Sequence, residues 1–273
     1  MKSGMLERIA RLTSRVKTSQ AHDPPALPDG ERAYVVGDIH GRADLLDQIH
    51  TRITEDRESA PPGARTSIVY LGDYIDRGAD SRGVIERLIA HPLPAEMVVH
   101  LAGNHEQAML EFLDGASDGY AWLAFGGHET VVSYGIRLLS AQPAKARMAK
   151  LREELAQAVP EAHVRFLRSL ALTHRIGDFL FVHAGVRPGR SLENQEKQDL
   201  LWIREPFLNC DRWLGRMIVH GHTVVDKPEI RANRICIDTG AYFSNRLTCL
   251  VVEGNQFRFL ETKLDGFAAN GKK

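Results

Sequence analysis

Residues 33–41 read AYVVGDIHG, an apolar run that ends at a glycine and is followed at once by Asp38 and His40. The same design recurs twice, as IVYLGDYIDRG at 68–78 and as MVVHLAGNHE at 97–106. Short apolar runs rich in β-branched residues predict buried strands. Three predicted strands, each about one βα unit after the last, therefore end in polar side chains.

Helical periodicity follows each of these runs, at 42–54, 81–90 and 105–113. Alternation of strand and helix predicts an α/β fold, in which a sheet that is at least partly parallel carries helices on its faces. Ligand sites in such sheets lie beyond the carboxyl ends of the strands. All three polar runs are expected at that edge.

The rest of the chain divides into three parts. Residues 114–171 lose the strand pattern and contain helical stretches at 144–158 and 161–170, which predicts a helical insertion at about 114–171. From Thr173 onward short strands return, at 179–182, 217–219, 234–237, 247–252 and 257–260. Residues 1–30 combine apolar residues at helical spacing with three prolines, so we expect an amphipathic N-terminal arm and linker before one large domain at 31–273. The arm is expected to pack on its own domain or to fray, and its basic residues leave open a membrane surface or a partner.

Composition excludes several classes of protein. Lys+Arg and Asp+Glu number 35 each, so no global field favours a nucleic-acid partner or an anionic membrane. The three cysteines lack CxxC spacing, which argues against a disulfide framework and against a thiolate zinc site. No apolar run has the length of a signal peptide or a transmembrane helix. We therefore expect a cytoplasmic protein without a transmembrane segment, and the oligomeric state stays open.

Two later strand ends add histidines, in VHAG at 182–185 and in HGHT at 220–223. Carboxylate, imidazole and amide groups gathered at one edge suit two divalent ions, which need one bridging carboxylate, and we assign that role to Asp73. The other predicted ligands are Asp38 and His40 for one ion, and Asn104, His183 and His222 for the second. Without a thiolate, the ligand set fits manganese, iron or zinc.

The positive charge of two divalent ions exceeds the negative charge of Asp38, Asp73 and a bridging hydroxide, so the site would attract phosphate and the same runs suggest how a phosphoester is cleaved. Two such ions lower the pKa of bound water, so they supply hydroxide near neutral pH. The leaving oxygen needs a proton, and we predict His105 as the general acid, held by Asp76. Arg77 is predicted to bind phosphate oxygens, which guanidinium geometry favours.

The order GDIHG, GDYIDRG, GNHE, HAG and HGHT over residues 34–252 resembles the metal-dependent phosphoprotein phosphatases of the PPP type, especially compact bacterial and phage members of the calcineurin-like metallophosphoesterase superfamily. The resemblance implies a calcineurin-like metallophosphoesterase fold over 31–273, with a central β-sandwich flanked by helices and a helical insertion. It implies the same metal ligands and the same acid pair. It adds Arg204, in LWIRE at 201–205, as a second phosphate-binding arginine.

One position departs from the familiar pattern. Many relatives carry an arginine directly before GNHE, where this chain has Ala102. Arg42 and Arg82 are candidates to replace that cation, although each also suits a solvated loop or helix start. Glu106 either caps its helix or orients His105, and His220 is expected beside the ligands rather than among them.

The resemblance implies a serine/threonine phosphoprotein phosphatase, in which metal-bound hydroxide attacks phosphate directly on a phosphoprotein or phosphopeptide and His105 is the general acid. A symmetrical dinucleoside-tetraphosphatase shares the metal core and remains an alternative. So does phosphotyrosine or a small phosphoester as substrate. An alternative of another class is a binding pseudoenzyme, in which the metals only stabilise the fold.

Overall fold

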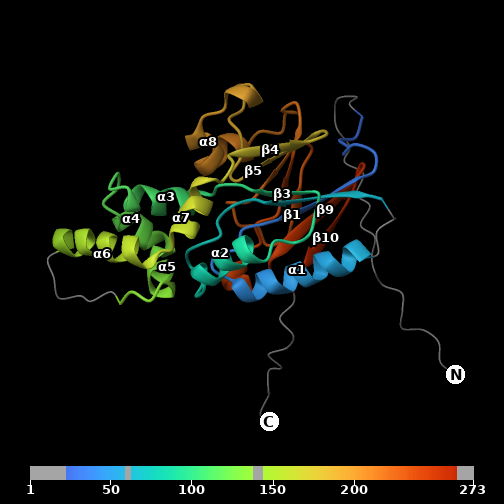
Figure 1. Cartoon of the computed structure of the whole chain (residues 1–273). Helices are drawn as coiled ribbons and strands as arrows, with labels where there is room; N and C mark the ends of the chain where they lie inside the picture. Colours follow the sequence, from blue (N-terminus) through green and yellow to red (C-terminus); the bar gives the residue numbers. More distant parts are fainter. Residues whose placement is uncertain (1–22, 59–62, 138–143, 263–273) are drawn as a thin grey trace, which may run out of the picture.

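The computed structural model describes residues 23–58, 63–137 and 144–262 of the chain, so residues 1–22 of the arm and linker predicted at 1–30 lie outside the described residues. Two five-stranded sheets lie at the centre, with helices on their outer faces (Figure 1). The predicted α/β fold with a central sandwich flanked by helices is confirmed. No helix in the described ranges is long and apolar enough to cross a membrane.

The first sheet has the strand order β10-β9-β1-β2-β3. Its parallel core is β1 (Glu31–Val36), β2 (Arg65–Tyr70) and β3 (Met97–His100), and β9 (Thr248–Glu253) and β10 (Gln256–Glu261) add antiparallel strands. Val35 pairs with Val69, which pairs with Val99, so the three strands end in register. The three polar runs of the sequence therefore emerge side by side.

The second sheet has the order β4-β5-β6-β8-β7. Here β5 (Phe179–Val182), β6 (Met217–His220) and β8 (Arg234–Cys236) are parallel, and the short edge strands β4 (Thr173–Ile176) and β7 (Glu229–Ile230) pair antiparallel. His183 directly follows β5 and His222 lies just beyond β6. The second sheet therefore delivers its two histidines at its own carboxyl edge.

Strand alternation builds a separate core on each face of the first sheet. In β1, Ala33 and Val35 face the second sheet, whereas Tyr34 and Val36 face the helices. Successive strand residues point to opposite faces, so a strand buried on both sides reads as a continuous apolar run. The cluster between the sheets also contains Val69, Leu71, Phe179, Phe181, Met217, Val219, Ile235, Leu250 and Val252.

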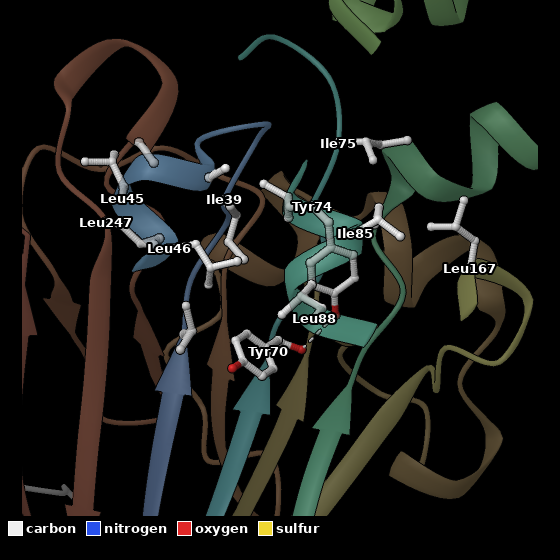
Figure 2. Close-up of a cluster of buried hydrophobic side chains, with 14 of the residues drawn as sticks. Ile39, Leu45, Leu46, Tyr70, Tyr74, Ile75, Ile85, Leu88, Leu167 and Leu247 are labelled. Carbon is white, nitrogen blue, oxygen red and sulfur yellow. Dashed lines mark hydrogen bonds between the residues drawn. The ribbon is translucent and has the colours of Figure 1, made fainter. Parts of the chain in front are cut away.

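Helices cover both outer faces. On the first sheet, α1 (Ala43–Glu58) and α2 (Ser81–Ala90) bury their apolar stripes around Tyr70 and Tyr74, as Figure 2 shows. On the second sheet, α8 (Lys197–Trp202) and α9 (Glu205–Leu208) pack through Leu200, Ile203 and Phe207 against Leu180, Val182 and Ile218. A short 3₁₀ helix, η2 (Leu192–Asn194), precedes α8. The helices therefore form a layer on the outer face of each sheet.

The described residues between β3 and β4 contain six helical segments and the loops that join them. They form α3 (Asn104–Leu113), α4 (Tyr120–Trp122), the π-helix η1 (Leu123–Gly127), α5 (His128–Ser133), α6 (Ala144–Ala158) and α7 (Glu161–Arg168). These helices gather at one end of the molecule (Figure 1). Trp122, Leu155 and Leu167 belong to the same apolar cluster as α1 and α2, so the helical part shares the core of the first sheet.

Residues 23–30 pack at the opposite end of the sandwich from the polar runs. The Ala26 N–H donates to Asp178 Oδ2 at 3.0 Å, and the Leu27 N–H donates to the Gly254 carbonyl at 2.9 Å. Leu27 is buried in the cluster between the sheets. This part of the predicted linker therefore contacts the turns of both sheets.

Candidate active site

Backbone strain is concentrated in the loops that follow the strands. Six non-glycine residues in the described chain have positive φ, and five of them lie here: His40, Asp73, Asp76, Arg77 and His222. The left-handed region costs a non-glycine residue roughly 1–2 kcal/mol. Strain of this kind clusters at functional sites because the surrounding structure holds it in place.

Two glycines of the sequence motifs leave room for carboxylates. A Cβ on Gly221 would lie 1.9 Å from Asp38 Oδ1, and a Cβ on Gly103 would lie 2.1 Å from Asp73 Oδ1. Any larger residue would push these carboxylates aside. The HGHT and GNHE runs therefore need glycine for steric reasons.

Asp73 lies at the centre of the buried polar groups. Its Oδ1 is 3.4 Å from His183 Nε2, and its Oδ2 is 3.5 Å from His40 Nε2. Ligands bound at ~2.1 Å to one ion are about 3.0–3.5 Å apart, so these spacings suit shared ions. Burial opposes ionisation of Asp73, but the surrounding imidazoles hold its pKa below the ordinary value.

The two imidazoles present unprotonated nitrogens to Asp73. His40 Nδ1 donates to the Ile75 carbonyl and His183 Nδ1 donates to the Leu71 carbonyl, each at 2.9 Å. Burial lowers the pKa of His40 to about 3 and also lowers the pKa of His183 and His222. Neutral imidazoles with one nitrogen fixed by a carbonyl are the usual metal-binding form.

Two acceptor atoms of Asn104 and His183 lie close together, and their spacing indicates whether a cation fits between them. Asn104 Oδ1 is 3.0 Å from His183 Nε2, the nitrogen that carries no proton because Nδ1 donates elsewhere. Two lone pairs at this distance repel each other, and a cation between them would remove the repulsion. The donor set therefore fits a metal ion.

Asp38 supports the same interpretation. Its Oδ2 accepts the His222 N–H at 2.9 Å, whereas its buried Oδ1 has no hydrogen-bond partner among the described residues. A buried oxygen without a partner costs free energy. Burial and the carboxylates of Asp238 and Asp73 raise the pKa of Asp38, and a cation would oppose that shift.

Two groups of buried side chains could each hold an ion, and they share Asp73. One joins Asp73 to His40 and His105, and the other joins it to His183 and His222. The predicted ligands of the first ion are Asp38, His40 and Asp73, whereas the first group contains His105 and not Asp38. The Asp38 carboxylate accepts the backbone N–H of His222. These two groups are consistent with a dinuclear metal site, and the ligand set of each ion stays a prediction.

The predicted acid pair is in contact. His105 Nδ1 donates to Asp76 Oδ2 at 2.6 Å, and both side chains are buried. Burial alone would lower the pKa of His105, but the carboxylates of Asp73 and Asp76 outweigh it and raise that pKa. His105 Nε2 is left facing Asp73 Oδ2 at 3.9 Å.

The two predicted phosphate-binding arginines differ in exposure. Arg77 is partly buried, with Nη1 3.0 Å from His40 Nε2 and its guanidinium 4.9 Å from the centre of the Tyr242 ring. Arg204 is exposed and donates to Thr223 Oγ1 at 3.1 Å. Arg77 therefore lies next to the loop of His40, and Arg204 lies next to the loop of His222.

The two candidates to replace the arginine missing at Ala102 each pair with other residues. Arg42 donates to Asn245 Oδ1 and to the carbonyl of Ala241, the first residue of α10 (Ala241–Ser244). Arg82 is paired with Glu86 at 2.7 Å along its own helix. Arg42 directly precedes α1 and Arg82 lies in the first turn of α2, so both arginines are at helix starts.

Glu106 orients two loops at once. Its Oε1 accepts the Tyr74 N–H at 2.8 Å, and its Oε2 accepts the N–H groups of Asp73 at 3.0 Å and Gly103 at 2.8 Å. Burial raises its pKa to about 8, yet both oxygens act as acceptors, an arrangement that the carboxylate satisfies. Glu106 therefore caps the start of α3 and also holds the loop that follows β2.

Sequence reasoning missed Trp122 and Thr130, which contact the predicted site. Trp122 Nε1 and Thr130 Oγ1 both donate to Asp76, at 2.9 and 2.6 Å. Asp238, at the end of β8, is buried, and burial raises its pKa to about 6. Trp122 and Thr130 lie in the helical stretch, where no strand-end pattern could identify them.

His220 Nδ1 donates to the Gly221 carbonyl, and the His220 ring packs on Phe207. Its predicted place beside the ligands rather than among them stays a prediction.

Buried His/Asp groups at the carboxyl edges of a two-sheet sandwich define a metal-dependent hydrolase. The family model of the calcineurin-like phosphoesterases matches residues 31–248, and the chain belongs to this family. It is therefore a metal-dependent phosphoesterase.

Relatives point to more than one substrate. The chain is 31% identical over 220 residues to serine/threonine-protein phosphatase 1 of Salmonella typhimurium, covering 79% of this chain and 89% of that protein. It is 26% identical over 236 residues to the asymmetrical bis(5'-nucleosyl)-tetraphosphatase PrpE of Bacillus mycoides, covering 79% and 88%. The crystal structure of a cold-active protein-tyrosine phosphatase from a psychrophilic Shewanella superposes with a TM-score of 0.54 at 15% identity, covering 95% of this chain and 89% of that one. This last likeness concerns the fold alone.

Proposed function

We propose that this phosphoesterase is a serine/threonine phosphoprotein phosphatase, acting on a phosphoprotein or phosphopeptide. The observation that carries the proposal is the buried hydrogen bond between Asp76 and His105, next to Asp73. A serine or threonine alkoxide is a strong base and needs a proton as it leaves, whereas a nucleotide phosphate leaves as a weak base. A positioned proton donor is most valuable for the alkyl monoester.

Six residues would hold two divalent ions around Asp73: Asp38, His40, Asp73, Asn104, His183 and His222. When bound, such ions polarise the phosphoryl group and supply a nucleophilic water near neutral pH. Arg77 and Arg204 would bind the phosphate oxygens. Since Arg77 donates to the His40 nitrogen that an ion would use, we expect metal binding to release Arg77 for the phosphate.

His105 would give its Nε2 proton to the leaving oxygen. Asp76 accepts the Nδ1 proton, so it fixes the orientation of the ring and stabilises the imidazolium. The carboxylates of Asp73 and Asp76 outweigh burial and raise the pKa of His105, which favours the protonated ring that a general acid requires.

A second candidate function is cleavage of dinucleoside tetraphosphates. The PrpE relative supports it, and that relative is named asymmetrical, whereas the sequence analysis considered a symmetrical enzyme. The weakly basic leaving group of such a substrate makes less use of His105. We therefore rank it below the phosphoprotein phosphatase. We rank the binding pseudoenzyme below both, because every predicted metal ligand and both members of the acid pair are present.

The test compares substrates on one preparation reconstituted with Mn²⁺. We expect phosphoserine and phosphothreonine peptides to exceed diadenosine tetraphosphate in kcat/KM by at least about tenfold, the scale of ordinary substrate discrimination. A phosphotyrosine peptide is the control for side-chain preference. Faster hydrolysis of diadenosine tetraphosphate would reject the proposal, and chromatography of its products would then identify symmetrical or asymmetrical cleavage.

A further inference from the structure

We propose that Trp122 and Thr130 are positioning residues that set the orientation of the Asp76 carboxylate. The helical stretch between β3 and β4 would thereby control proton donation at a site built from strand ends. The inference rests on the role that the proposed function gives to Asp76 and His105. Neither Trp122 nor Thr130 reaches the phosphate in this scheme, because both act through Asp76.

Thr130 holds Asp76 at two points. Its hydroxyl donates to Asp76 Oδ1 at 2.6 Å and accepts the Asp76 backbone N–H at 2.9 Å. Ser81 Oγ is 2.8 Å from the same hydroxyl, and Ser81 must be the donor there because the single proton of Thr130 is already used. Thr130 is fully buried, so water does not compete for these contacts.

Trp122 holds the other carboxylate oxygen. Its indole N–H donates to Asp76 Oδ2 at 2.9 Å, the oxygen that also accepts from His105 at 2.6 Å. With Thr130 on one oxygen and Trp122 on the other, rotation of the carboxylate would break at least one bond. The direction from which Asp76 meets His105 is therefore fixed by the helical stretch.

The segment that carries these residues lies tightly against the loop of Asp76. A Cβ on Gly127 would lie 2.5 Å from the Trp122 indole. A Cβ on Gly126, whose φ is +113°, would lie 2.6 Å from the Arg77 side chain, and the Gly126 carbonyl accepts the Arg77 N–H at 3.0 Å. One segment thus contacts both Asp76 and its neighbour Arg77 closely.

The test uses the leaving group to separate positioning from general damage. The assay compares phosphoserine peptide, which needs a proton on its alkoxide, with p-nitrophenyl phosphate, whose leaving group is a weak base. Thr130→Val and Trp122→Phe should each lose about tenfold in kcat on the peptide and less than about twofold on p-nitrophenyl phosphate, because weakened general-acid catalysis affects only the first. Thr130→Ser keeps the hydroxyl and should restore most of the peptide rate.

Thr262→Val is the matched control, since it removes a buried threonine hydroxyl that binds the Leu247 N–H and does not touch Asp76. Equal losses on both substrates, or no loss on either, would overturn the positioning role. If Thr130→Val does not fold, Trp122→Phe carries the same comparison. His105→Asn distinguishes failure of this inference from failure of the proposed function. If His105→Asn lowers the rates on both substrates equally, the acid role of His105 is rejected. If His105→Asn lowers only the peptide rate and Thr130→Val lowers neither rate, only the positioning role of Thr130 is rejected.

Discussion

At the scale of single atoms, buried acceptors at this site are consistent with a bound cation. Asn104 Oδ1 and His183 Nε2 are two acceptors 3.0 Å apart, and Asp38 Oδ1 is a buried acceptor without a hydrogen-bond partner in the described structure. Buried polar atoms in folded proteins are normally satisfied. A bound cation would satisfy these acceptors, which is consistent with a metal site.

Metal affinity should fall between pH 7 and pH 5. Burial raises the pKa of Asp238 to about 6, so this carboxyl gains a proton between pH 7 and pH 5. A divalent ion that binds beside it favours the ionised form and must therefore release that proton. His40, with a pKa of about 3, stays neutral throughout this window. Titration calorimetry with Mn²⁺ in buffers of different ionisation enthalpy should detect proton release at pH 6. Asp238→Asn should flatten the pH dependence, and an unchanged slope would contradict this assignment.

Removing the acid pair should separate turnover from metal binding. Asp76→Asn and His105→Asn should each retain two ions per chain while losing about 10²–10⁴-fold in kcat on a phosphoserine peptide, the usual contribution of general acid catalysis. Metal content by emission spectroscopy and the rate on the same sample measure both quantities. Unchanged rates in both variants would remove these residues from the mechanism.

At the scale of elements, one side chain couples two loops. Glu106 is at the third position of α3 and bonds the Gly103 N–H that precedes this helix. The same carboxylate bonds the N–H groups of Asp73 and Tyr74 after β2. The loop of Asp73 and the start of α3 therefore form one hydrogen-bonded unit.

Glu106→Gln should weaken that unit. Both carboxylate oxygens of Glu106 accept backbone N–H groups, but the amide of Gln has only one acceptor oxygen. Its NH₂ group would therefore face N–H donors and leave them without an acceptor. Leaving buried N–H groups unpaired costs about 1–3 kcal/mol, which chemical denaturation would measure as a lower free energy of unfolding. Glu111→Gln, on the exposed face of the same helix, is the control and should change it little. Equal stability of the two variants would contradict the coupling.

For the whole molecule, the predicted ligands come from both halves of the sandwich. Asp38, Asp73 and Asn104 follow strands of the first sheet, whereas His183 and His222 follow strands of the second. Ions bound between them would link the two sheets. Metal binding should therefore stabilise the sandwich as a unit.

Removal of the metals by a chelator should lower the midpoint of thermal unfolding. A ligand present at 100 times its Kd stabilises by about 2.7 kcal/mol, which for a chain of this size corresponds to roughly 5–10 °C. Differential scanning fluorimetry with Mn²⁺ and with excess chelator measures the shift. Asp73→Asn lacks the central carboxylate and should show little shift, so an equal response in both proteins would place the stabilising metal elsewhere.

Features with strong periodicity or fixed geometry were predictable from the sequence. The bounds of α2, α6 and β5 match the prediction, because long helical patterns and fully apolar runs leave little choice. The edge strands β4 and β7 were not predicted, since they owe their conformation to pairing with a neighbour. The same contrast holds at the site: parallel strand ends had to converge, whereas Thr130 meets Asp76 only through the tertiary packing of the helices.

The left-handed residues at the strand ends affect how this protein would respond to directed evolution. Glycine adopts positive φ without the penalty of the five residues there, so a glycine at any of them would relieve roughly 1 kcal/mol of strain while deleting a functional side chain. A library selected for heat resistance alone would therefore tend to enrich glycine at the positions that carry the chemistry. Thermostable variants of this enzyme should be chosen by a selection that demands turnover in every round.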